Sequence, residues 1–255
     1  MNYLLDQLRL LKNASQPISQ ESIAKLLPLK WSTQRLMADQ IAEFMPDGGT
    51  VLEVGCGGSL TLHFLAERGY EATGVDKNEA MIEYSQYLKH VLSSDVMLRL
   101  ADAFKLPFPD KSFDYVYSVG MIEHYDPAHQ RQLASELVRC SRKYVHVEIP
   151  NPHPHSAFFA TGLESEETHF AVHPGALLEV AGCRIVRSDG RCLATFKRQA
   201  EANPNYLQFR TTRSPELVKD TFGQNDIPAL IALDRSASTS ERLLYAFQLY
   251  WVACR

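Results

Sequence analysis

The sequence lacks the marks of several protein classes. Its 255 residues include five cysteines, which are odd in number, scattered and never spaced as C-x-x-C. That pattern argues against a disulfide framework and a cysteine zinc site, and it favours a reducing compartment. No uninterrupted apolar run could span a bilayer, and residues 1–12 lack the continuous apolar core of a signal peptide. We therefore expect a cytoplasmic protein that does not enter a membrane.

Positive charge is also scarce. Lys and Arg number 26 against 30 Asp and Glu, so the net charge is −4, and no basic run stands out. This balance gives no general attraction to nucleic acid. Residues 17–41 faintly resemble a helix-turn-helix, but residues 33–44, where a basic recognition face would lie, offer only Arg35 against Asp39 and Glu43. We expect packing or a lid from this segment rather than DNA binding, and the sequence leaves the oligomeric state open.

Strand and helix patterns alternate from residue 50 onward. Apolar and β-branched stretches predict strands at 51–54, 72–75, 96–100, 113–119, 144–149, 184–188 and 247–254. Helical patterns lie between them at 60–68, 79–90, 128–142 and 175–181. This alternation indicates right-handed crossovers onto one parallel sheet, whose ligands bind at the carboxyl ends of the strands. One α/β domain with an appendage suits a chain of this length.

Several segments do not follow this alternation of strands and helices. Apolar residues at helical spacing within 3–12, and again after a possible N-cap at Ser19, predict short helices. Residues 1–45 are therefore predicted to form an N-terminal helical extension or lid, and residues 46–255 the main domain. Two insertions interrupt that domain, at about 151–174 and 189–240. The first is too long for a simple connection, so it is either functional or mobile.

The densest motif is residues 50–59, which read Thr-Val-Leu-Glu-Val-Gly-Cys-Gly-Gly-Ser. A predicted strand ends there in glycines and leads into a helix. Because glycine has no Cβ, such a turn lets backbone N–H groups and a helix N-terminus approach a bound polar group. A dinucleotide fingerprint requires G-x-G-x-x-G. If Gly55 is the first glycine of that motif, Leu60 occupies the place of the third glycine. The spacing therefore argues against a nicotinamide dehydrogenase.

Acidic residues follow the next two predicted strands. Asp76 ends the second strand, about twenty residues after the glycines, where a carboxylate can accept from both hydroxyls of a ribose. Asp102 follows the third strand and could accept from the exocyclic amine of adenine. Each acid alone is more often a solvated turn residue. Acids at successive strand ends together predict a nucleoside ligand with an intact ribose diol.

Five motifs in order carry a family resemblance. They are Glu53-Val-Gly-Cys-Gly-Gly-Ser, Gly74-Val-Asp76, Ala101-Asp102-Ala103, Leu106-Pro-Phe-Pro-Asp-Lys-Ser-Phe-Asp114 and Ser118-Val-Gly-Met-Ile-Glu-His124. Together they resemble the class I S-adenosylmethionine-dependent methyltransferases, and within them the small-molecule enzymes. The likeness covers about residues 35–190. It implies a Rossmann-like, doubly wound, seven-stranded, mostly parallel sheet with an antiparallel last strand and an N-terminal helical extension.

The resemblance also implies cofactor-binding residues in the glycine turn. Gly55 and Gly57, with Cys56 between them, would pass under the methionine and ribose portions of S-adenosylmethionine. Glu53 would brace the turn, through water to the cofactor amine. The departure is Ser59, because the family often has a third glycine at that position.

Further along the chain, the resemblance assigns the nucleoside end of the cofactor. Asp76 would hold the ribose hydroxyls, and Lys77 would lie beside the adenine. Asp102 and the backbone of Ala103 would read the adenine edge. Ser118 and Gly120, at the end of the fourth strand, would approach the methionyl group.

Methyl transfer from a sulfonium is an in-line displacement, so positioning can supply much of the catalysis. A general base helps where the acceptor must lose a proton. His124 follows the fourth strand beside the expected methyl position, and His169 lies in the histidine-rich insertion, so both are candidate bases or acceptor contacts. The alternatives are that His124 orders its loop and that the insertion is a solvated segment. No carboxylate pattern completes a metal motif, so we expect no metal site.

The sequence thus predicts a methyltransferase that uses S-adenosylmethionine and methylates O, N or C of a small-molecule acceptor. Two alternatives stay open. One is a methyltransferase for protein or RNA, which the lack of a basic surface signal weakens for RNA. The other is a catalytically silent protein of the same fold that only binds the cofactor. Neither DNA nor a membrane is an expected partner.

Overall fold

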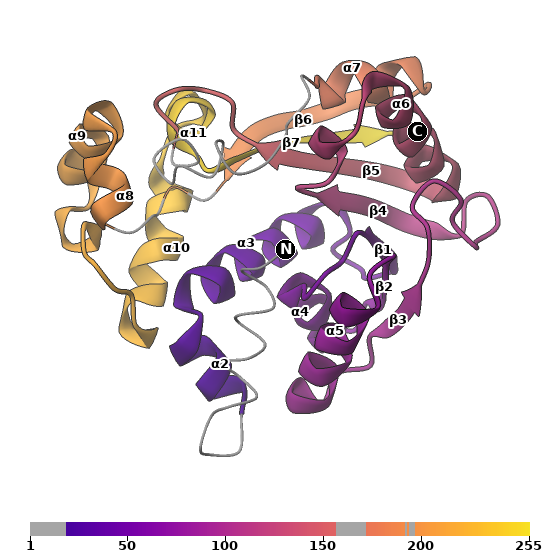
Figure 1. The fold of residues 1–255 in the computed structure, drawn as a ribbon, viewed down its shortest axis with the longest axis horizontal. Coiled ribbons are helices and arrows are strands. Elements are labelled where there is room, and N and C mark those ends of the chain that lie inside the picture. The colour runs from indigo at the N-terminus through magenta and orange to yellow at the C-terminus, as the bar shows by residue number, and fades with distance from the viewer. Residues whose placement is uncertain (1–18, 157–171, 192, 194–196) are drawn as a thin grey trace.

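The computed structural model describes residues 19–156, 172–191, 193 and 197–255, and a seven-stranded sheet forms its centre (Figure 1). The strand order is β3-β2-β1-β4-β5-β7-β6. The strands are β1 (Thr50–Val54), β2 (Glu71–Asp76), β3 (Met97–Leu100), β4 (Phe113–Val119), β5 (Ser141–Pro150), β6 (Arg184–Arg191) and β7 (Gln248–Cys254). Strands β1 to β5 pair in parallel, and β7 runs antiparallel to both β5 and β6. The predicted fold class is confirmed.

Helices cover both faces of the sheet. The helices before β6 are α2 (Gln20–Leu26), α3 (Pro28–Phe44), α4 (Leu60–Glu67), α5 (Glu79–Leu92), α6 (Pro127–Cys140) and α7 (Pro174–Val180). Between β6 and β7 lie α8 (Lys197–Glu201), α9 (Pro204–Arg213), α10 (Ile227–Ser236) and α11 (Thr239–Tyr245). In Figure 1, α3, α4 and α5 lie below the sheet and α6 and α7 above it. No helix within the described ranges is long and apolar enough to cross a membrane.

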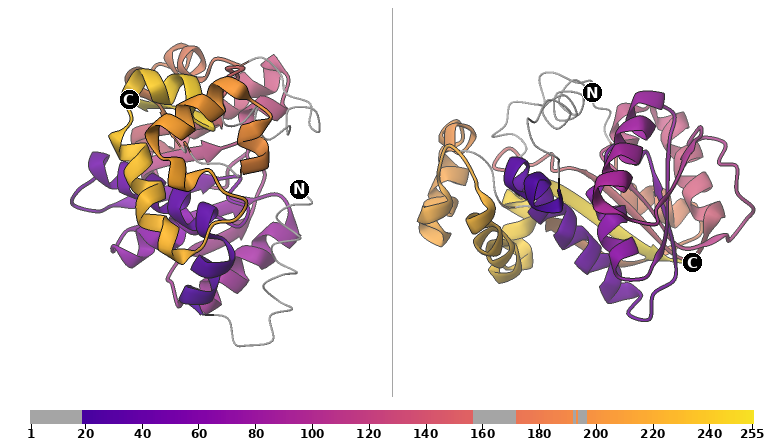
Figure 2. Two further views of the ribbon diagram at one scale, coloured as in Figure 1. Left: turned by 90° about the vertical axis from the view of Figure 1, so that its left-hand side faces the viewer. Right: turned by 90° about the horizontal axis from the view of Figure 1, so that it is seen from below.

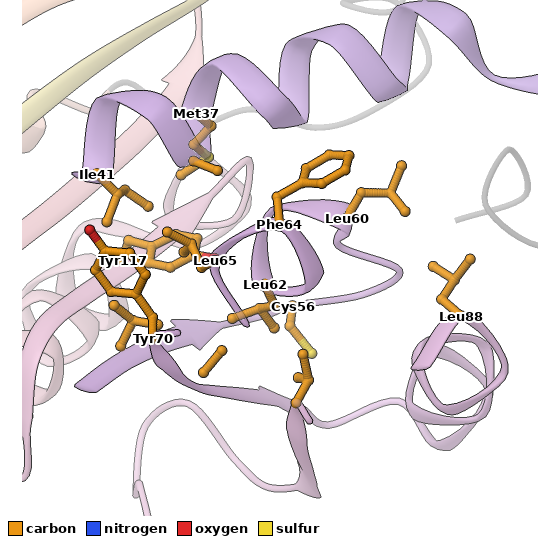
Figure 3. Packing of buried hydrophobic residues seen from close by; sticks show 14 of the residues in the cluster. Met37, Ile41, Cys56, Leu60, Leu62, Phe64, Leu65, Tyr70, Leu88 and Tyr117 are labelled. Atoms are coloured by element: carbon orange, nitrogen blue, oxygen red, sulfur yellow. The ribbon is translucent and has the colours of Figure 1, made fainter. Parts of the chain in front are cut away.

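Helix α3 is part of the main hydrophobic core. Met37 and Ile41 point from α3 toward Phe64 of α4 and Tyr117 of β4, and all four side chains are buried (Figure 3). Residues 31–33 lie inside α3, and α2 is separated from α3 by Leu27 alone. Residues 19–44, the described part of this segment, therefore form two helices and not the predicted helix-turn-helix. The helix predicted within residues 3–12 lies outside the described residues.

The second insertion is a helical unit between β6 and β7. Helices α8 to α11 surround a hydrophobic core of their own, and they lie at one end of the molecule (Figures 1 and 2). Because β6 runs antiparallel to β7, as β5 does, β6 points the same way as β5 and the unit leaves the sheet at the carboxyl edge of the parallel strands. Leu29 of α3 packs against its core. The unit therefore borders the edge at which ligands of such sheets bind.

Candidate active site

The glycine turn after β1 has a backbone that only glycine adopts readily. Gly55 has a φ of +75° and Gly57 a φ of +47°, both in the left-handed region. The N–H groups of Gly55 and Cys56 each donate to the carbonyl of Val75 in β2, at 2.9 Å. A Cβ at Gly55 would lie 2.6 Å from the Sδ of Met121. The turn is thus fastened to β2 and approached closely from the end of β4.

Asp76 connects this turn to the end of β2. Its Oδ2 accepts a hydrogen bond from the N–H of Gly57, and its Oδ1 accepts one from the N–H of Asn78, both at 2.9 Å. A carboxylate offers about four acceptor positions, so about two remain for a ligand. Asp102 follows β3, is exposed, and accepts from the N–H of Phe104 at 3.0 Å.

A cavity of about 190 Å³ lies at the carboxyl ends of β1 to β4. The sequence-predicted residues that line it are Gly55, Asp76, Lys77, Asp102, Ala103, Gly120 and His124. Met121 and Tyr125 also line it, and the sequence had given Met121 no role. Tyr125 forms one wall: its ring lies 4.9 Å from that of Phe104, and the Nζ of Lys77 lies 5.7 Å from its centroid.

Of the other predicted cofactor residues, Cys56 and Ser118 do not line the cavity, whereas Gly120 does. Cys56 and Ser118 are buried, and the Ser118 hydroxyl lies 3.7 Å from the Sδ of Met121. Gly120 has a φ of +61°, and its N–H donates to the carbonyl of Glu148 at 2.9 Å, which joins the end of β4 to β5. These contacts fix the backbone at the end of β4.

Glu53 is buried beneath the turn on the sheet face that α3 covers. Its Oε2 accepts from the Tyr117 hydroxyl at 2.8 Å. Burial raises the pKa of Glu53 to about 8, although hydrogen bonds from Ser59 and Tyr117 and the charge of Lys30 oppose the rise. Burial lowers the pKa of Lys30 to about 8, against the attraction of Glu53. Lys30 belongs to α3, where no sequence motif marked it.

Gln34 of α3 fixes this helix against the start of α4. Its Oε1 accepts from the Thr61 hydroxyl at 2.8 Å, from the Thr61 N–H at 3.2 Å and from the Ser59 hydroxyl at 3.3 Å. An N–H in the first turn of a helix has no partner within the helix, and Gln34 supplies one from outside. The small Ser59 at the family's glycine position thus contributes a hydrogen bond.

His124 is the candidate base that the structure brings to the cavity. It ends the short 3-10 helix Ile122–His124, and its Nε2 lies 4.0 Å from Oε1 of the buried Glu123. His169, the other candidate, lies outside the described residues. Of the neighbouring histidines, His173 caps α7 by accepting from the N–H of Ala176 at 3.0 Å.

Comparison with known proteins identifies a methyltransferase domain. Residues 51–143 match the family model described as a methyltransferase domain. A ubiquinone biosynthesis O-methyltransferase of Alkalilimnicola ehrlichii is 30% identical over 129 residues, which cover 49% of this chain and 52% of that protein. A 27-O-demethylrifamycin SV methyltransferase of Amycolatopsis mediterranei is 30% identical over 117 residues, which cover 44% of this chain and 43% of that protein. The chain spans about half the length of the curated relatives it matches.

Solved structures share the fold at low sequence identity. The magnesium protoporphyrin IX methyltransferase of Synechocystis PCC 6803, solved with bound SAH, has a TM-score of 0.58 and 14% identity, covering 98% of this chain and 93% of that one. A SAM-dependent methyltransferase from Archaeoglobus fulgidus has a TM-score of 0.57 and 22% identity, covering 87% of this chain and 94% of that one. The fold is that of the class I S-adenosylmethionine-dependent methyltransferases. Residues 51–143 of this chain thus form a methyltransferase domain.

The residues around the cavity fit the cofactor of that class. Asp76 lines the cavity and keeps about two acceptor positions beyond its two backbone hydrogen bonds, and the exposed Asp102 carboxylate lies at the adjacent strand end. Gly55 has no side chain, and the Met121 sulfur occupies the space next to its backbone. Glu53 and Lys30 lie beyond the turn, and burial brings the pKa of each to about 8. The acceptors at the strand ends fit the hydroxyls and the amine of an adenosine.

Proposed function

We propose that this protein transfers a methyl group from S-adenosylmethionine to an O, N or C atom of a small-molecule acceptor. One observation carries the proposal: Asp76 and Asp102, at adjacent strand ends, meet the glycine turn around a single cavity. The curated relatives described above bear the names of O-methyltransferases or of a methyltransferase for a rifamycin. Those names favour oxygen as the acceptor atom.

The proposed roles of the binding residues are those that the family resemblance implies, and their positions support them. Asp76 would accept from the two ribose hydroxyls, Lys77 would lie beside the adenine, and Asp102 with the Ala103 backbone would read the adenine edge; all four residues line the cavity. The backbone from Gly55 to Gly57 would pass under the ribose and methionine portions. Ser118 and Gly120 would approach the methionyl group, and the hydrogen bond of Gly120 to Glu148 of β5 fixes the backbone there.

When bound, S-adenosylmethionine supplies a sulfonium methyl that an acceptor takes by in-line displacement. His124 lines the cavity, so its imidazole can take a proton from an acceptor hydroxyl. Glu123, 4.0 Å from the Nε2 of His124, would stabilise the imidazolium that forms. His169 is proposed as a further base or acceptor contact, and this role rests on the sequence alone.

Residues 1–45 and the two insertions are proposed to enclose the acceptor. Contacts of α3 support this, because Lys30 and Gln34 reach the glycine turn region while Leu29 packs against the helical unit between β6 and β7. We also propose a cytoplasmic location. It is supported by free thiols at all the described cysteines, which are Cys56, Cys140, Cys183 and Cys254.

Incubation with isotopically labelled S-adenosylmethionine and a cell extract tests the reaction. We expect label in one small product that mass spectrometry can identify. Label in protein or RNA would favour the macromolecular alternative. Binding of S-adenosylhomocysteine without label in any fraction would favour a protein that has lost the chemistry.

A further inference from the structure

A second hollow of the molecule lies between two helices and apart from the cofactor cavity. Helix α10 packs beside α3 (Figure 1), and a groove of about 740 Å³ lies between them. This volume is within the range of about 300 to 1,000 Å³ that is usual for small-molecule sites. No described residue lines both the groove and the cofactor cavity. The groove is therefore a separate candidate site.

The two hollows use different sides of α3. Trp31 and Arg35 line the groove, whereas Gln34 reaches the start of α4 beside the glycine turn. Successive residues of an α-helix are turned by about 100°, so Trp31 and Arg35 lie about a quarter turn or more around α3 from the side that carries Gln34. A ligand in the groove would thus contact α3 without touching the cofactor site.

Most of the groove lining is apolar. Four residues of α10 at spacings of three and four form one stripe along it, namely Pro228, Ile231, Ala232 and Arg235. On the α3 side Trp31 forms the floor, because it is buried and its ring lies 4.7 Å from that of Phe64 in an edge-on arrangement. A molecule that covered this stripe would remove apolar surface from water.

The charged residues of the lining are both arginines. The chain has a net charge of −4, yet no carboxylate is among the described residues that line the groove. Arg235 is 62% exposed and pairs with Asp39 at 2.7 Å. The guanidinium of the half-buried Arg35 lies 5.5 Å from the centroid of the Phe64 ring, and within the described ranges it has neither an ion pair nor a hydrogen bond. Its N–H donors are therefore available to an anion.

This combination selects one kind of ligand. An apolar body can cover Trp31 and the α10 stripe, while a carboxylate can form two parallel hydrogen bonds with the planar guanidinium of Arg35. A neutral apolar molecule would leave those donors unused. A cationic molecule would be repelled by both arginines.

We propose that the groove between α3 and α10 binds a small amphipathic carboxylate, with its apolar part along Trp31 and Ile231 and its carboxylate on Arg35. This site goes beyond the proposed methyl transfer, because it shares no lining residue with the cofactor cavity. Its competitor is a contact between two copies of the chain through the same apolar stripe.

Calorimetric titration with decanoate and 1-decanol tests the carboxylate assignment. Wild type should bind both, and Arg35→Met should weaken decanoate by about 10-fold, the lower end for losing a charge-assisted hydrogen bond, because Arg35 is only half-buried. The affinity for 1-decanol should change by less than about twofold. Arg35→Lys should keep part of the decanoate affinity. Octanoate, which has two fewer methylenes, should bind wild type about 3- to 10-fold more weakly.

Tryptophan emission locates the ligand. The chain has two tryptophans, so Trp251→Phe leaves Trp31 as the only one. Decanoate that carries bromine at its far end should quench Trp31 emission by contact, with the same dissociation constant that calorimetry gives. Saturable binding that leaves Trp31 emission unchanged would place the ligand elsewhere and overturn the proposal.

Two variants serve as controls. Arg99→Met is matched to Arg35→Met, because the Arg99 guanidinium also lies over a phenylalanine ring, 5.8 Å from that of Phe108, but outside the groove. It should bind decanoate as wild type does. Ile231→Asp places a negative charge on the apolar stripe and should abolish decanoate binding. Should Arg35→Met fail to fold by circular dichroism, Arg35→Gln replaces it.

The remaining outcomes are decisive as well. Absence of decanoate binding to wild type overturns the proposal, as does equal weakening of decanoate and 1-decanol in Arg35→Met. A dimer in sedimentation analysis that Ile231→Asp dissociates would assign the groove to a second copy of the chain. S-adenosylhomocysteine should bind Arg35→Met within about twofold of wild type, so its failure to bind wild type would overturn the proposed function alone.

Discussion

The carboxylate of Asp76 accepts a hydrogen bond from the backbone N–H of Gly57 at 2.9 Å. The acid proposed to hold the ribose therefore also holds the glycine turn in shape. Since Gly57 has a φ of +47°, this bond stabilises a backbone conformation that few other residues adopt. A substitution of Asp76 should weaken ligand binding in two ways, because it removes a hydrogen-bond acceptor and also loosens the turn.

Gly55→Ala should lower both stability and cofactor affinity. The φ of +75° costs a residue with a Cβ about 1–2 kcal/mol, and the new methyl group would lie 2.6 Å from the Met121 sulfur. Thermal unfolding and titration with S-adenosylhomocysteine measure the two effects. Gly69→Ala is the matched control, because its φ is +85° but its Cβ would meet nothing within 4 Å. It should be destabilised by the backbone cost alone and keep full affinity; equal affinity losses in both variants would contradict the account.

His124→Gln should separate chemistry from binding. If His124 takes a proton from the acceptor, kcat should fall by about 10²- to 10⁴-fold, whereas S-adenosylhomocysteine should bind within about threefold of wild type. Steady-state kinetics on the identified acceptor and calorimetry give the two values. His129→Gln is the control, since His129 is exposed and pairs with Asp126 at 2.8 Å outside the cavity. An unchanged kcat in His124→Gln would remove the proposed base.

The strand-end residues were predictable because topology alone brings them together. Asp76 and Asp102 each follow a strand of a parallel sheet, so their meeting at one edge needs no knowledge of side-chain packing. Lys30 and Gln34 were not predictable in the same way. They lie in an amphipathic helix whose polar positions read as solvent-facing, and only the docking of α3 turns them toward the glycine turn.

Buried charge was the other feature that the sequence concealed. Arg191 and Glu148 form an ion pair with side chains 1% and 0% exposed, which joins β6 to β5 beneath α3. Charged residues are ordinarily read as surface positions, because burial is costly without a partner. The sixth strand was accordingly predicted to end at residue 188, with Arg191 in the insertion that follows. In the structure, β6 continues to Arg191.

Asp114 should matter for stability and not for the cofactor, although it ends one of the family-like motifs. Burial alone would raise the pKa of Asp114, but hydrogen bonds from Thr50, Arg142 and Lys143 lower it to about 2. A carboxyl with a depressed pKa stabilises the fold above its unfolded value of about 4, and this contribution is lost as the pH falls toward 2. Asp114→Asn should cost about 1–2 kcal/mol at pH 7.

Chemical denaturation of wild type and Asp114→Asn between pH 7 and pH 2 measures this contribution. The difference in the free energy of unfolding should shrink as the pH falls below about 4. Affinity for S-adenosylhomocysteine should match wild type, because Asp114 lies at the start of β4, at the opposite end of the strand from Gly120. A difference that stays constant with pH would contradict the assigned hydrogen bonds.

His63 should make the protein sensitive to mild acid. Burial, assisted by the charge of Lys89, lowers the pKa of His63 to about 4, and its Nδ1 lies 2.5 Å from the Ser94 hydroxyl. Between about pH 6.5 and pH 4 only the unfolded chain takes up the proton at this residue. The free energy of unfolding should therefore fall across that window by up to about 3 kcal/mol. In His63→Gln this component should vanish, and an identical pH dependence in both proteins would refute it.

The most direct test of the account is calorimetric titration of wild type and Asp76→Ala with S-adenosylhomocysteine. Wild type should bind one equivalent, and Asp76→Ala should bind about 100-fold more weakly or not at all, because two ribose hydrogen bonds and the tie to Gly57 are lost. Asp110→Ala, which removes an exposed acid paired with Arg139, should bind as wild type does. Absence of binding to wild type, or unchanged binding to Asp76→Ala, would contradict the assignment of this site to S-adenosylmethionine.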